Sequence, residues 1–504
     1  MAIMNRILTA LTSRLTFGYT GQIKNGDRAD GLVEILARAY ERARNALEYR
    51  ADNLVRRAAI ERILRRIMVL SKDPAKITED LLTELRWAKY ISQEETKIIK
   101  DMNIARVLTK YVNYKGTVPQ DWVVKIASSE IEDLFNLNTD YKQFTFFAFQ
   151  IIRQKVQLED PNLDLLVYFA TDKIYAGSDN EQIAYHILGL AGEEADKEKF
   201  EEAWRLFNLA KSHKQMSRIN KFVRKQMPPL IILRDIYFYE PAVFKEIITD
   251  KAKFEEKAEE VLDIQLNQMS GKIATAGFRS VLYVFLTKMV LAFGLEVPFE
   301  ILVYGRMNLF PLSVNLIFPP VLMWLTTSQI RLPNKKDQEA LIKRTWYVME
   351  NFDELKNEED TLKNSGRDEV YGFGYYIFTI TYWLFFIGVF WAIYFGLGKI
   401  GYTFFSKFIF IFFLTIIAFF AYRISQITKV YSWKESRGLN TSLMDIISLP
   451  ILTTGSYLSQ GLSRLNFLAF AFDFILEAPF KIILGFVDDW AHFLSIKKDE
   501  QIIE

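Results

Sequence analysis

The longest uncharged apolar stretches of the chain lie in its last third. Residues 370–398 contain no Asp, Glu, Lys or Arg, and a second uncharged run covers 408–422. A helix that crosses about 30 Å of hydrocarbon needs roughly 20 apolar residues, because each residue adds about 1.5 Å. The first run reaches this length by itself, and the second reaches it from Ile400 if the amine of Lys407 extends to the interface. The pattern predicts a transmembrane hairpin over 370–425.

An earlier apolar region, residues 271–332, predicts another transmembrane hairpin. Its first helix is expected over 277–295 and its second over 309–330, with a kink at Pro319. Prolines are tolerated in such helices because neighbouring helices can satisfy the carbonyls that lose their partners. A charged connector over 333–369 then joins the two hairpins.

Three charged residues of the first hairpin are candidates for a functional site. Lys288, Glu296 and Glu300 would be costly in lipid unless they pair with one another or face a wet cavity. Residues of this kind can carry protons or ions. Alternatively, the two glutamates flank Pro298 and lie at the outer interface.

The last apolar segment, Leu465–Val487, is interrupted by Asp473, Glu477 and Lys481. Their spacing of four places them on one helical face. This pattern favours an amphipathic helix that lies in the membrane interface, and the alternative is a span with a buried charged stripe. We therefore assign residues 426–504 to C-terminal amphipathic or membrane-associated helices.

Lysine and arginine residues gather on one side of the predicted hairpins. The hairpin tips hold little more than Arg306 and Lys399, so the positive-inside rule predicts a bacterial inner-membrane protein with both termini and the connector in the cytoplasm. The basic residues on that side are Arg331, Lys335, Lys336, Lys343, Arg344, Lys356, Lys363 and Arg367 of the connector region, and Arg423, Lys429, Lys434 and Arg437 after the last clear span.

In residues 1–270 apolar residues recur with helical periodicity, and there is no sustained alternation of apolar and polar residues of the kind expected for a sheet. This pattern predicts a cytoplasmic helical domain. Its first long helix is expected to end near Leu70, and further breaks are expected at 117–119, 177–180 and 228–229. One face of that helix is rich in arginine, which favours a solvated face paired partly with Glu34, Glu41, Glu48 and Glu61 over a surface that binds anionic lipid. The arginines are Arg38, Arg42, Arg56, Arg62, Arg65 and Arg66.

Residues 183–211 resemble one tetratricopeptide hairpin. The packing positions of such a repeat are matched by Leu190, Ala191, Phe200, Ala203, Phe207 and Ala210. No neighbouring copy occurs at the period of about 34 residues that stacked repeats need. An ordinary helical hairpin is therefore expected.

Composition and motifs exclude several classes of protein. The 63 Lys and Arg balance 61 Asp and Glu, which gives no electrostatic case for a nucleic-acid partner. The absence of Cys excludes disulfides, thiolate metal sites and a Cys nucleophile. The three histidines form no HExxH motif, and the GxGxxG at Gly396, Gly398 and Gly401 lies in a hairpin tip without the strand that a nucleotide site needs. We therefore expect no enzyme, catalytic residue, cofactor or bound metal.

Two local resemblances accompany this pattern. The C-terminal stretch from Leu449-Pro450-Ile451 through residues 474–481, FILEAPFK, to Asp489-Trp490 resembles uncharacterised multi-span membrane proteins of candidate-phyla (Patescibacteria-type) bacteria, which implies no known activity. Val297-Pro298-Phe299 followed by Leu309-Phe310-Pro311 resembles the membrane segment of mitochondrial cation exchangers of the LETM type. The prolines of that family between these motifs are missing here, and another hairpin stands where its large matrix domain would follow.

The sequence thus predicts an all-α protein: an N-terminal helical domain, two transmembrane hairpins and a C-terminal amphipathic or membrane-embedded helix. The favoured function is a non-enzymatic membrane scaffold, whose partners are the lipid bilayer and a cytoplasmic protein bound by residues 1–270. The alternative is a transporter or ion-conducting protein whose path is lined by Lys288, Glu296 and Glu300.

Overall fold

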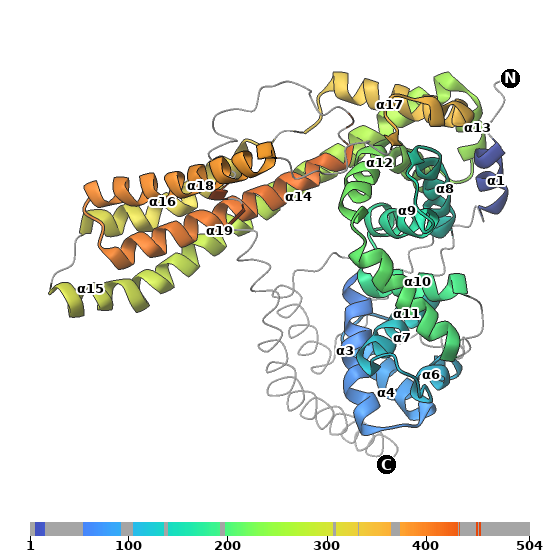
Figure 1. Cartoon of the computed structure of the whole chain (residues 1–504), viewed down its shortest axis with the longest axis horizontal. Helices are drawn as coiled ribbons and strands as arrows, with labels where there is room; N and C mark the ends of the chain where they lie inside the picture. The colour runs from blue at the N-terminus through green and yellow to red at the C-terminus, as the bar shows by residue number, and fades with distance from the viewer. Residues whose placement is uncertain are drawn as a thin grey trace, which may run out of the picture. The chain divides into compact units, whose positions relative to one another are not determined.

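The chain is almost wholly helical, as predicted (Figure 1). The computed structural model describes residues 6–15, 54–91, 104–135, 140–191, 197–305, 309–330, 332–363, 373–431, 433, 450–451 and 453–454. These residues form two compact units. The N-terminal unit holds the described residues of 3–226 together with 351–363, and the C-terminal unit holds 227–350 and the described residues of 364–467.

The N-terminal unit is built from short amphipathic helices around an aliphatic and aromatic core. Ile60, Leu81, Val123 and Phe144 are fully buried in this core. Its elements are α1 (Arg6–Arg14), α3 (Val55–Leu70), α4 (Pro74–Trp87), α6 (Ile104–Val112), α7 (Gln120–Phe135), α8 (Asp140–Gln154), β1 (Val156–Gln157), α9 (Leu163–Thr171), the π-helical turn η2 (Asp172–Ala176), α10 (Asn180–Ala191), α11 (Lys197–Ser212) and the first part of α12 (Met216–Tyr239).

Most of the predicted helix breaks are confirmed, and one is wrong. Helix α3 ends at Leu70, and the stretches 117–119 and 177–179 lie between helices. Helix α12, however, continues through Pro228 and Pro229. The turns that follow the prolines bury apolar side chains such as Leu230 and Ile236, and this burial outweighs the two lost backbone hydrogen bonds.

The arginine-rich face of α3 is held in ion pairs to several helices. Arg56 pairs with Glu132, Arg66 pairs with Glu84, and Arg65 pairs with Asp121 as well as Glu61. Arg57, which the sequence did not single out, is fully buried between Glu61 and Asp179. These arginines therefore stabilise their own unit through ion pairs. The remaining residues of the predicted face lie outside the described residues: Arg38, Arg42, Glu34, Glu41 and Glu48.

The tetratricopeptide-like segment forms the two helices α10 and α11, which pack against each other. Phe200, Ala203, Phe207 and Ala210 are buried as predicted. Leu190 is 64% exposed, so the expectation that it is a packing residue is wrong. The residue lies in the last turn of α10, where no described neighbour covers it.

A segment that precedes the second predicted hairpin belongs to the N-terminal unit. It contains the 3₁₀ turn η4 (Phe352–Asn357) and β2 (Leu362–Lys363), which pairs in parallel with β1. The amine of Lys155 is buried and donates to Gln226 at 2.8 Å and to Glu358 at 2.7 Å. The connector predicted over 333–369 is therefore divided between the two units. Residues 351–363 belong to the N-terminal unit, whereas the helix before them, α17 (Lys335–Glu350), belongs to the C-terminal unit.

The first predicted hairpin begins in one very long helical rod. Helices α14 (Lys251–Leu291) and α15 (Val297–Tyr304) are joined without a break by the π-helical turn η3 (Ala292–Glu296), giving 54 residues in all. Two expectations change: the first helix is not confined to 277–295, and the boundary drawn at 270/271 falls inside α14. Pro298 lies directly after η3, in the first turn of α15, and the rod continues through it.

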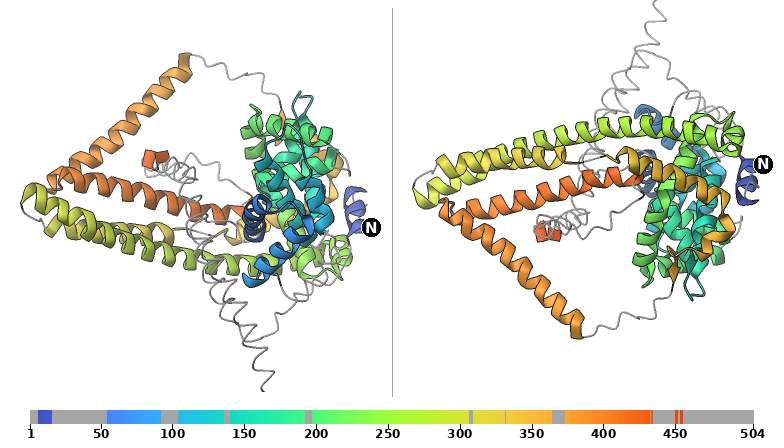
Figure 2. Two further views of the ribbon diagram at one scale, coloured as in Figure 1. Left: turned by 90° about the horizontal axis from the view of Figure 1, so that it is seen from below. Right: turned by 90° about the horizontal axis from the view of Figure 1, so that it is seen from above.

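In the part of the C-terminal unit that the structure describes, four helices are long and apolar enough to cross a membrane: the rod Lys251–Tyr304, α16 (Leu309–Ser328), α18 (Phe373–Lys399) and α19 (Phe404–Thr428). Helix α14 packs against α16 and α19, which also pack on each other, while α18 leaves the turn and diverges from α19 (Figure 2). The amine of Lys407 lies over the ring of Tyr394 at 4.2 Å. The remaining helix of this unit, α13 (Phe244–Thr249), precedes the rod, and η5 (Lys429–Tyr431) follows α19.

The exterior of these helices is apolar and their interior is partly polar. Phe278, Leu302, Trp324 and Leu384 are each more than half exposed, whereas several ionisable groups are buried. This is the reverse of a water-soluble fold, in which large apolar patches are covered and charges face solvent. The arrangement is compatible with an integral membrane protein.

Candidate functional site

The buried polar groups of the C-terminal unit converge where α14, η3, α15, α16 and α19 meet. Lys288 on α14 and Glu296 in η3 are both fully buried, and their charged atoms lie 3.4 Å apart. The π-helical turn separates them by eight residues rather than the seven of two ordinary helical turns, so Glu296 still points back towards Lys288. Such a turn is frequent at functional sites.

Two further helices contribute to the carboxylate of Glu296. Asn315, fully buried on α16, donates from its amide nitrogen to Oε1 of Glu296 at 2.6 Å. Ser406, 1% exposed near the start of α19, donates from its hydroxyl to the same oxygen. The carboxylate therefore ties three separate helices together inside the bundle.

A second carboxylate joins the cluster one helical turn later. Glu300 on α15 is 4% exposed, and its Oε1 accepts from Thr403 at 3.0 Å. The same oxygen lies 3.3 Å from the hydroxyl oxygen of Ser406. Glu296 and Glu300 consequently share one hydroxyl group.

The shared hydroxyl sets a limit on the charge state of the pair. Ser406 has one proton and can donate it to only one carboxylate at a time. Two charged carboxylates that share this donor repel each other, and a proton or another cation bound to the pair reduces the repulsion.

Three aromatic and polar groups complete the cluster. The amine of Lys288 lies over the ring of Phe413 at 5.0 Å, which offers a cation–π contact in place of water. The hydroxyl of Tyr402 and the side-chain oxygen of Asn315 are buried, and neither has a hydrogen-bond partner among the described residues. Tyr402 is near enough to Glu296 for the two groups to interact electrostatically.

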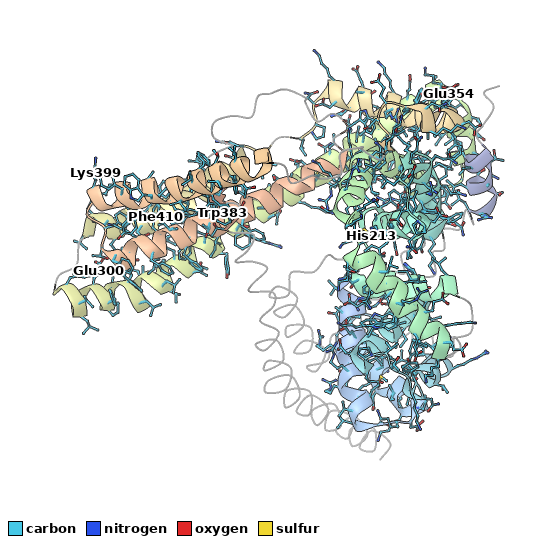
Figure 3. The ribbon with its side chains drawn as sticks, in the orientation of Figure 1. His213, Glu300, Glu354, Trp383, Lys399 and Phe410 are labelled. Carbon is cyan, nitrogen blue, oxygen red and sulfur yellow. The ribbon has the colours of Figure 1, made fainter. Side chains whose placement is uncertain are left out.

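The cluster lies towards the end of the bundle that carries the hairpin turns. Glu300 and Lys399 mark this end in Figure 3, and Thr403 belongs to the turn between α18 and α19. Ser406 and Phe413 are seven residues apart along α19, so the cluster extends about 10 Å along the bundle from that end. Beyond it, the same helix interfaces bury only small polar side chains, Ser280, Thr327 and Thr415.

The structure brings together the three site residues predicted in the first hairpin. Glu296 and Glu300 lie inside the bundle, because the rod continues through Pro298 and turns both side chains inward. The predicted polar residues Asp473, Glu477 and Lys481 lie outside the described residues. Three residues of the cluster were not predicted from the sequence: Asn315, Tyr402 and Ser406. Of these, only Asn315 could have been noticed, because its polar amide interrupts the apolar sequence of α16.

Other types of site find little support in the described part of the chain. No group of three or more His, Cys, Asp or Glu side chains there has the arrangement of a metal site. Gly396 and Gly398 lie within the last turn of α18 and Gly401 in the turn that follows, at φ +90°. Comparisons with protein-family models, with curated proteins and with solved structures find no match to this chain.

Proposed function

We propose that this chain is an integral membrane protein that moves a cation across the bilayer through the cluster of Lys288, Glu296 and Glu300. The observation that carries the proposal is the hydroxyl of Ser406, which lies within hydrogen-bonding distance of both carboxylates. A buried pair of carboxylates that share a single donor is suited to bind and release one positive charge.

The energetic cost of the cluster also favours transport over a purely structural role. A membrane anchor requires no ion pair in its interior, since apolar side chains of similar volume pack there without any desolvation penalty. Here Lys288 and Glu296 are fully buried between three apolar helices, the rod, α16 and α19. Ionisable groups at such a place are most often part of an ion or proton path.

A scaffold was the function favoured by sequence alone, and it remains the alternative. In that case the N-terminal unit binds a protein partner and the cluster only aligns the helices. In the transport proposal the same unit regulates the membrane helices. Both proposals place the N-terminal unit, the 333–369 connector and the C-terminus in the cytoplasm of an inner membrane, on the basis of the lysine and arginine distribution.

Flux measurements in proteoliposomes separate the two functions. Purified full-length protein is reconstituted with an entrapped dye that reports protons, Na⁺ or K⁺, and a gradient of the matching ion is imposed. Transport predicts that the wild type dissipates at least one gradient and that Glu296→Gln and Lys288→Ala abolish the signal. Thr415→Val, which removes a buried hydroxyl of α19 outside the cluster, serves as the control. If liposomes with the wild-type protein dissipate these gradients no faster than empty liposomes, the transport proposal is rejected.

A further inference from the structure

Lys288 is the only cation in direct contact with either of the two carboxylates among the described residues, and its charge enters the balance of the site. Its amine lies 3.4 Å from Glu296. Among the residues that the structure describes near the hairpin turns, the two other basic side chains lie over aromatic rings, Lys399 over Phe395 and Lys407 over Tyr394. One lysine and two glutamates, when all are charged, leave one uncompensated negative charge.

Uncompensated charge is expensive where water is excluded, so the site is most stable when its net charge is zero. One proton or one monovalent metal ion brings the net charge to zero. A divalent ion would leave a positive charge of one, as unfavourable as the empty site. The lysine therefore restricts the charge of the ion that the cluster accepts.

The unpartnered oxygens indicate that the ion can be a metal ion as well as a proton. The Asn315 oxygen and the Tyr402 hydroxyl are buried without a hydrogen-bond partner among the described residues, and an unfilled acceptor is costly in that environment. Together with Glu296, Glu300 and Ser406 they provide oxygen atoms, which are the ligands preferred by hard cations. A proton alone would leave at least one of these oxygens without a partner.

We infer that Lys288 makes this cluster a site for one monovalent cation, an alkali ion or a proton in competition with it, and that Tyr402 and Asn315 supply oxygen ligands to the alkali ion. The inference rests on the proposed cation transport and specifies its substrate class. Binding of the alkali ion displaces the proton from the carboxylate pair to solvent, so charge is conserved at the site. Lys288 thereby acts as a selectivity residue rather than as a ligand.

Thermal denaturation of the full-length protein in nanodiscs tests this inference. NaCl, KCl and CaCl₂ are compared with N-methylglucamine chloride at constant ionic strength. The wild type should be stabilised by Na⁺ or K⁺ and not by Ca²⁺, and the stabilisation should weaken as the pH is lowered because protons compete. Lys288→Met should change the preference, with an affinity for Ca²⁺ at least about tenfold higher than in the wild type. Lys288→Arg, which keeps the charge, should keep the monovalent preference.

Tyr402→Phe is a second, milder variant. It removes only a hydroxyl that has no hydrogen-bond partner among the described residues, so the fold should be retained while alkali-ion affinity falls and the response to pH persists. Stabilisation of the wild type by Ca²⁺ as strong as by Na⁺, or a monovalent preference that survives in Lys288→Met, would overturn the inference while leaving cation transport intact. A wild type that responds to neither pH nor any of these ions would reject the inference and the proposed transport together.

Discussion

The hydroxyl of Ser406 donates to the carboxylate of Glu296 across 110 positions of sequence. This contact joins the start of α19 to the π-helical turn that follows α14, and so connects the second hairpin to the first. Glu300 approaches the same hydroxyl at 3.3 Å. One serine thus links the two hairpins and holds the two carboxylates in a common site.

Removal of this hydroxyl tests its contribution to ion binding. Ser406→Ala should weaken cation binding about tenfold or more, because hydrogen bonds to charged groups contribute about 1.5–3 kcal/mol. The midpoint of cation-dependent thermal stabilisation measures the change. Thr415→Val on the same helix should leave the midpoint unchanged, and equal midpoints for the wild type and Ser406→Ala would exclude the serine from the site.

Close packing of α14 on α16 depends on the absence of a side chain at Gly277. A Cβ there would lie 3.3 Å from Cβ of Thr327, tighter than ordinary van der Waals contact. Gly277→Leu should therefore destabilise the bundle by about 1–3 kcal/mol through overpacking. Gly271→Leu is the matched control on the same helix, since nothing lies within 4 Å of its added Cβ. Equal melting temperatures for the two variants in detergent would contradict the close approach of the helices.

The buried Arg57 is a sensitive point of the N-terminal unit. Its guanidinium lies 2.8 Å from Glu61 and 2.7 Å from Asp179. Arg57→Met leaves two largely buried carboxylates without their shared partner and should cost about 3–5 kcal/mol of unfolding free energy. Arg65→Met, at a half-exposed pair, should cost less than about 1 kcal/mol. Hydrogen exchange of the α3 amides in the full-length protein measures both effects, and similar exchange in the two variants would refute the difference.

The stability of the N-terminal unit should also depend on pH through His186. Burial and the positive charge of Lys142 lower the pKa of His186. The Asp172 carboxylate at 2.7 Å and the nearby Asp133 raise it, and together they outweigh the first two effects, so the pKa is raised overall. A histidine with a raised folded-state pKa contributes stability that is fully present below its unfolded pKa of about 6.5 and is lost as the pH rises through the folded value. The melting temperature should therefore fall between mildly acidic and mildly alkaline pH more steeply in the wild type than in His186→Gln. Parallel pH profiles would show that this ion pair does not contribute.

The sequence predicted the parts of this fold that depend on local patterns. The two uncharged runs after residue 370 were sufficient to predict α18 and α19, because length and hydropathy are local properties. The continuity of the rod through Pro298 and of α12 through Pro228 and Pro229 was not predictable, since it depends on packing against distant segments.

The candidate site was predicted in part. Charged residues within an apolar region can be recognised from the linear sequence, as with Lys288, Glu296 and Glu300. Asn315, Tyr402 and Ser406 are common residue types, and they become significant only when α16 and α19 bring them to the same carboxylate. No pattern in the sequence encodes a contact across 110 positions.

The central claim is that the cluster holds one exchangeable positive charge, and proton release on cation binding tests it most directly. Purified protein in weakly buffered nanodiscs is titrated with NaCl or KCl while the pH is recorded. The account predicts release of about one proton per chain from the wild type and none from Glu296→Gln. Absence of release from the wild type at every pH tested, or unchanged release from Glu296→Gln, would contradict it.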